Sequence, residues 1–82
     1  MGKEQLEVDV ASAKLEAAQA EADRAQKAWA RAQDLLRQHS ISATDADQAE
    51  CDYKVAQAGV KEATAELEIA KLALPKKSKA KG

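Results

Sequence analysis

The stretch RAQDLLRQHSIS, residues 31–42, decides how this chain folds. It ends one apolar repeat with two adjacent leucines, passes through a polar segment that holds the only histidine, and leads into a second apolar repeat. The register of the apolar positions is lost around residues 39–41, and such a loss predicts a break between two helices.

The segment before the break has an apolar residue at every first and fourth position of a heptad. The first positions are Val8, Leu15, Ala22, Trp29 and Leu36, and the fourth positions are Ala11, Ala18, Ala25 and Ala32. An apolar repeat with this period of 3.5 residues is typical of a left-handed coiled coil.

The segment after the break repeats the pattern, with Ala46, Tyr53, Val60, Leu67 and Leu74 at first positions and Ala49, Ala56, Ala63 and Ala70 at fourth positions. Because a short connection makes neighbouring helices antiparallel, the sequence predicts an all-α coiled-coil hairpin. We expect helices at about residues 5–38 and 43–74, with the turn at 39–42.

The seam is the surface along which the two helices pack. When the chain is folded back on itself, six of the large seam residues fall opposite an alanine, as Trp29 does opposite Ala49, and this alternation fills the seam without voids. The larger seam residues are expected to be Val8, Leu15, Trp29, Leu36, Tyr53, Val60, Leu67 and Leu74.

The ends of the two helices carry suitable capping residues. Ser42 is followed three residues later by Asp45, which resembles a capping box and predicts that Ser42 caps the second helix. Arg37 and His39 lie where cations favour the C-terminal end of a helix. Pro75 is expected to end the second helix.

Charge divides the chain into two parts, a helical hairpin at residues 1–75 and a basic, flexible tail at 76–82. Four of the 13 basic residues lie in this tail, which leaves nine basic and 14 acidic residues, a net charge of −5, in residues 1–74. A body this acidic is a poor ligand for nucleic acid, because phosphates repel it.

Several other classes of function are excluded by length and composition. No apolar run approaches the roughly 20 residues that span a bilayer. An 82-residue chain without Phe has room for only a thin core. The single Cys51 and the single His39 have no partner of metal-ligand spacing. We therefore expect no enzymatic activity, no cofactor, no metal and no membrane insertion of this segment.

Two residues before the break resist a purely structural explanation. Arg31 and Leu35 fall outside the seam positions, four residues apart on one face of the helix, and we expect both side chains to be exposed. His39 continues this spacing toward the turn.

Arg31, Leu35 and Ser42 form the pattern R-x3-L-x6-S around the predicted turn. The pattern resembles the hairpin end of periplasmic adaptor proteins, also called membrane fusion proteins, of Gram-negative tripartite efflux and type I secretion systems. The adjacent LL, IS and DQA sequences are similar to that family too. The resemblance covers about residues 5–74.

The resemblance implies a function in transport through protein–protein contacts. The hairpin would bind the periplasmic end of a TolC-type outer-membrane channel, with Arg31 donating hydrogen bonds, Leu35 filling an apolar groove and Ser42 permitting close approach. The parent protein would be a periplasmic hexamer anchored at the inner membrane, and domains absent from this chain would contact an inner-membrane transporter.

Two other interpretations stay open at this stage. A generic antiparallel coiled coil could serve as a structural spacer or an oligomerisation module, without a binding role for the turn. A helical arm that grips RNA would need a basic stripe, which the acidic body does not favour. The sequence leaves open the class of transporter, its cargo and the oligomeric state of the isolated hairpin.

Overall fold

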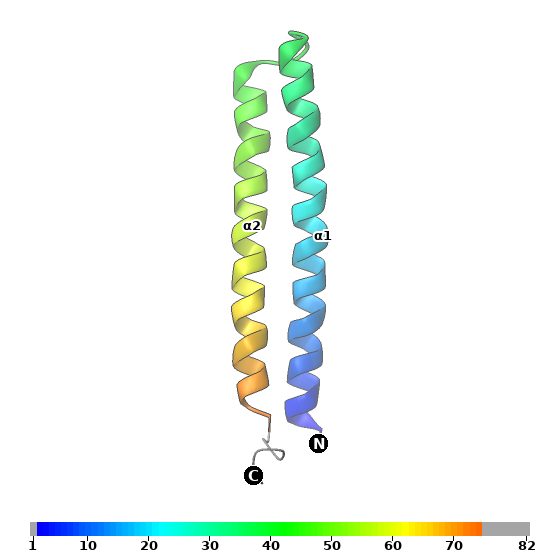
Figure 1. Cartoon of the computed structure of the whole chain (residues 1–82), viewed down its shortest axis with the longest axis vertical. Helices are drawn as coiled ribbons and strands as arrows, with labels where there is room; N and C mark the ends of the chain where they lie inside the picture. The colour runs from blue at the N-terminus through cyan, green and yellow to red at the C-terminus, as the bar shows by residue number, and fades with distance from the viewer. Residues whose placement is uncertain (1, 75–82) are drawn as a thin grey trace.

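The computed structural model describes residues 2–74 and contains two α-helices, α1 (Lys3–Arg37) and α2 (Ala43–Leu72). The helices lie side by side and antiparallel, with the turn at one end of the molecule and both helix ends that face the termini at the other (Figure 1). The molecule is a rod whose principal extents are 63 × 21 × 14 Å. The predicted all-α hairpin is confirmed.

Both helices begin and end close to the predicted positions. The first helix was expected at 5–38 and spans Lys3–Arg37, whereas the second was expected at 43–74 and spans Ala43–Leu72. The last turn of α2 tightens, since Ala73 N donates to Ala70 O and Leu74 N donates to Lys71 O, both at 3.1 Å. The early end fits the rule that a residue before proline avoids helical geometry. Pro75 itself and the predicted basic tail at 76–82 lie outside the described residues.

The end of α1 is closed by backbone hydrogen bonds. His39 N donates to Leu36 O at 2.9 Å and Ser40 N donates to Leu35 O at 2.7 Å. These two bonds form a Schellman motif, in which the residue after the cap has a left-handed backbone. His39 occupies that position, with φ of 61°, and is the one non-glycine residue with positive φ in residues 2–74.

Ser42 caps the start of α2, as predicted. Its backbone is extended, with φ of −82° and ψ of 162°, and its Oγ accepts a hydrogen bond from Asp45 N at 3.1 Å. In the described part of the chain, the reciprocal bond from Ser42 N to the Asp45 carboxylate, which would complete a capping box, is absent. The serine is therefore the effective cap.

The core is thin and consists mainly of alanine. The buried residues are Ala11, Ala25, Ala32, Ala46, Ala56, Ala63 and Leu67, all at first or fourth heptad positions. The other large seam residues, which are Val8, Leu15, Trp29, Leu36, Tyr53, Val60 and Leu74, are half-buried. Two helices alone cover small side chains between them fully, whereas most of the larger ones keep part of their surface in contact with water.

Trp29 and Tyr53 stack on each other across the seam. Their ring centroids are 5.5 Å apart and the ring planes are inclined by 30°. The Tyr53 hydroxyl oxygen also accepts a hydrogen bond from Gln57 Nε2 at 2.9 Å. The predicted alternation placed an alanine opposite each ring and did not include this aromatic pair. The pair forms because long side chains can reach neighbours that lie diagonally across the seam.

Neither α1 nor α2 contains a stretch long and apolar enough to cross a lipid bilayer.

Candidate partner-binding site

The tip, which we define as residues 31–47, is the end of the rod where α1 stops, the chain turns and α2 starts (Figure 1). Arg31 and Leu35 are four residues apart on α1, so they lie on one face of the helix, one turn apart. Ser42 immediately precedes α2. The fold thus brings all three candidate residues to the same end of the molecule.

Arg31 is exposed and makes no hydrogen bond or ion pair within residues 2–74. The acid that could have paired with it, Asp34, forms an ion pair with Arg37 instead. A guanidinium group presents five N–H donors in a fixed plane, which suits carboxylate and carbonyl acceptors. The hairpin leaves all five available to a partner.

Leu35 is half-buried, and the prediction that its side chain is exposed was wrong. Leu36, which occupies a seam position, falls in the same class of burial. The physical reason is the small size of the seam residues: helices that pack through alanine lie close together, so positions beside the seam are partly covered as well. Leu35 therefore offers a partner only part of its apolar surface.

Ser42 is exposed, and its Oγ already accepts the capping hydrogen bond from Asp45 N. A hydroxyl group has one hydrogen to donate besides its acceptor lone pairs. The cap uses an acceptor position only. Ser42 thus holds the first turn of α2 and keeps a donor that can reach a partner.

His39 is the tip residue whose role the sequence analysis missed. We placed it at the end of α1 as a favourable cation, whereas the structure shows it as the left-handed residue of the Schellman motif. A signal was present in the sequence, because residues 38–42 contain no glycine or asparagine. Histidine is among the few other residue types enriched in the left-handed region.

The charges of the tip differ between its two helices. The end of α1 carries Arg31, Asp34 and Arg37, whereas the start of α2 carries Asp45 and Asp47. Helix dipoles favour cations in the last turn of a helix and anions in the first turn, so Arg37 and Asp45 stabilise the hairpin, whereas Arg31 lies more than one turn before the end of α1. The charges alone consequently do not identify a partner.

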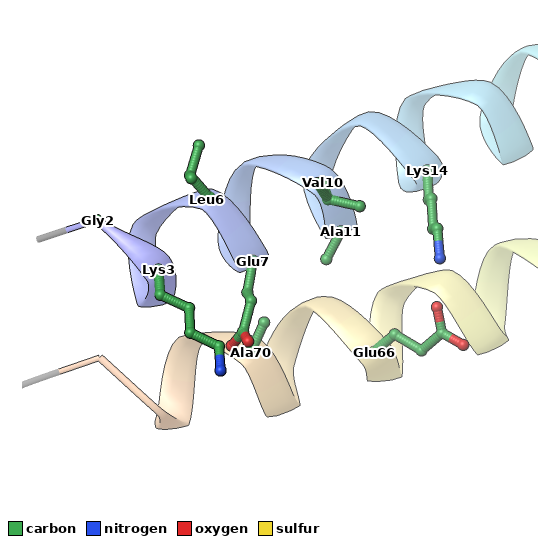
Figure 2. Close-up of a pocket in the computed structure, with 9 residues that line it drawn as sticks. All are labelled: Gly2, Lys3, Leu6, Glu7, Val10, Ala11, Lys14, Glu66 and Ala70. Atoms are coloured by element: carbon green, nitrogen blue, oxygen red, sulfur yellow. The ribbon is translucent and has the colours of Figure 1, made fainter.

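A groove between the helices lies at the opposite end of the rod. In Figure 2, Ala11 on α1 and Ala70 on α2 point toward the opposite helix, whereas Leu6 on α1 points away from α2. Lys14 on α1 and Glu66 on α2 extend toward each other across it. This groove contains none of the residues that the sequence singled out for binding.

Two features of the described residues concern metal ligands and thiols. In residues 2–74, no three His, Cys, Asp or Glu side chains gather in a way that could hold a metal ion. Cys51 is an exposed free thiol on α2.

The fold and the tip together define a class of protein, a two-helix coiled-coil hairpin whose free end is available to a partner. Residues 7–75 match the family described as the RND MFP alpha-helical hairpin domain, where MFP stands for membrane fusion protein. The match spans both helices and the turn, so this chain belongs to that family. The family is periplasmic and assembles with partners in the outer and inner membranes. No curated protein and no solved structure gave a match.

Proposed function

We propose that this chain is the hairpin by which a periplasmic adaptor binds the periplasmic end of a TolC-type outer-membrane channel, in a tripartite efflux or secretion system. The observation that carries the proposal is the unpaired Arg31 guanidinium at the turn end of a membrane fusion protein hairpin. Asp34, the nearby acid, is paired with Arg37, so no acidic side chain of the hairpin pairs with Arg31 in the described residues.

The three tip residues would divide the work of binding. Arg31 donates hydrogen bonds to carboxylate or backbone carbonyl oxygens of the channel, and the partly exposed Leu35 beside it fills a small apolar groove and excludes water. Interfaces commonly combine an arginine with an apolar anchor in this way. Ser42, a small residue at the turn, permits close approach of the channel backbone.

In the parent protein the hairpin would work as one of six copies, placed side by side in the periplasm. The exposed apolar residues of the outer surfaces support lateral packing; they are Leu6, Val10, Val55, Ile69 and Leu72, each 54–71% exposed. The first two and the last two lie at the same end of the rod, away from the tip. Parts of the parent outside this hairpin would contact the inner-membrane transporter and anchor the protein at that membrane. The function is one of assembly and involves no catalysis.

The same exposed apolar residues favour a second candidate, a structural spacer or oligomerisation module with no binding role for the tip. The two functions predict different effects of substitutions. Under the second, changes at the tip leave every interaction intact, whereas changes on the outer surfaces alter the oligomeric state. Sedimentation of the wild type and of tip variants separates the two.

The decisive experiment is a pull-down of a purified TolC-type channel by the hairpin and its variants. Arg31→Asp and Leu35→Ser are expected to abolish binding while the helical circular dichroism stays unchanged. Lys27→Asp is a matched control, because it makes the same charge change on an exposed residue one turn farther from the tip. Leu35→Met, which conserves volume, should retain binding. Full binding by both Arg31→Asp and Leu35→Ser would refute the proposal.

A further inference from the structure

The backbone of His39 is held in a conformation that suits glycine. Its φ of 61° lies in the left-handed region, which brings Cβ too close to the following carbonyl oxygen in residues with a side chain. Glycine has no Cβ and adopts the same conformation freely. Histidine at this position therefore costs more conformational free energy than glycine would.

The hairpin itself gains little from the imidazole. The hydrogen bonds of the turn are donated by His39 N and Ser40 N, which a glycine at position 39 would preserve. In the part of the chain that the structure describes, the imidazole makes no hydrogen bond or ion pair, and the residue is exposed. A cation near the end of α1 is already provided by Arg37. Neither the folding of the turn nor the helix dipole requires a histidine here.

His39 lies at the same end of the rod as the three candidate partner-binding residues. It lies between Leu35 and Ser42 in the chain, and the bond from Ser40 N to Leu35 O ties the turn to the last turn of α1. The ring is consequently carried on a defined backbone at the extreme end of the rod, beyond Arg31 and Leu35.

We infer that His39 is a further partner-contact and specificity-determining residue of the tip, whose imidazole donates a hydrogen bond to a carboxylate or backbone carbonyl oxygen of the protein that Arg31 binds. A neutral imidazole has one N–H donor and an imidazolium has two. The nearby Arg31 guanidinium is a pure donor, so a partner surface rich in acceptors satisfies both groups. The inference rests on the proposed docking function.

The test compares two substitutions that separate the side chain from the backbone. His39→Gly removes the imidazole and the left-handed strain, and is expected to raise Tm by about 4–8 °C. His39→Asp also removes the N–H donor but keeps a residue type that tolerates the left-handed region. His39→Gly is expected to weaken binding of the full chain to a purified TolC-type channel in detergent by about five- to tenfold, the effect of one lost hydrogen bond, and His39→Asp by at least as much.

Interferometry with the full chain immobilised at high density gives the affinities, and Arg31→Ala serves as the docking control. Weaker binding by Arg31→Ala together with unchanged binding by His39→Gly would overturn this inference alone. Weak binding by His39→Gly with full binding by His39→Asp would overturn it too, since the effect would then belong to the rigidity of the turn. Unchanged binding by Arg31→Ala would refute the docking function, and this inference with it.

Discussion

Replacing Trp29 by alanine tests whether the aromatic pair stabilises the middle of the rod. Trp29 is half-buried, so truncation returns about 100 Å² of apolar surface to water, worth about 2.5 kcal/mol. Its stacking on Tyr53 at 5.5 Å adds about 1 kcal/mol, a typical value for an aromatic pair. We expect Trp29→Ala to lower the free energy of unfolding by about 3 to 4 kcal/mol in total.

This loss is large compared with the stability of so thin a protein. A chain of 82 residues has a free energy of unfolding of about 4–12 kcal/mol, and a core of alanine places this rod near the lower limit. Trp29→Ala should therefore leave much of the chain unfolded at room temperature. Urea denaturation followed by far-ultraviolet circular dichroism measures the change.

A double-mutant cycle isolates the stacking itself. Trp29→Leu and Tyr53→Leu each keep an apolar side chain, so the variants should stay folded, and their coupling energy is expected to be about 0.5–1.5 kcal/mol. Val55→Ala is the control, because Val55 is 65% exposed and its truncation should change stability by less than about 0.5 kcal/mol. A coupling energy near zero, or a Trp29→Ala loss no greater than that of Val55→Ala, would refute the reasoning.

Three further predictions concern single positions in the hairpin, and for each the change in the free energy of unfolding is measured from denaturation curves. Gly59→Ala should stabilise the protein by about 0.5–1 kcal/mol, because Gly59 lies inside α2 and an added Cβ meets nothing within 4 Å. Lower stability of this variant would mean that in solution another group lies close to Gly59 and clashes with the added Cβ. Ser42→Ala should cost about 1 kcal/mol through loss of the bond to Asp45 N, whereas Ser42→Asn, which also caps, should cost little. Equal effects of the two would show that the cap is not the source. Ala25→Leu should cost about 1–3 kcal/mol by overpacking, since Ala25 is only 6% exposed. A gain in stability would show that the helices can separate to admit a larger side chain.

The hairpin could be predicted from the sequence because each signal is local. The repeat of 3.5 residues depends on spacing along the chain alone, and it placed every buried residue within residues 2–74 on the seam. The Ser42 cap depends on a residue only three positions away. Signals of this kind do not require knowledge of how far apart the helices lie.

The features that could not be predicted depend on the distance between the helices or on the geometry of the turn. Whether Leu35 is exposed depends on how closely α2 approaches, and whether Trp29 reaches Tyr53 depends on diagonal contacts across the seam. The left-handed backbone of His39 follows from how the Schellman bonds close the helix, in a segment without glycine. The partner of the tip could not be derived either, since helix dipoles alone explain the charges of Arg37 and Asp45.

Because both helices share the same heptad period, the length of the rod can change in steps of seven residues per helix without disturbing the packing. Lys3 and Leu72, the outer ends of α1 and α2, lie at the same end of the rod. Deleting seven residues from each helix at matching heights would preserve the apolar repeat on both sides. It would shorten the rod by about 10 Å, at 1.5 Å per residue, and leave the tip intact. Insertions of the same size would lengthen it equally, so the gap that such a hairpin bridges can change without any change in what it binds.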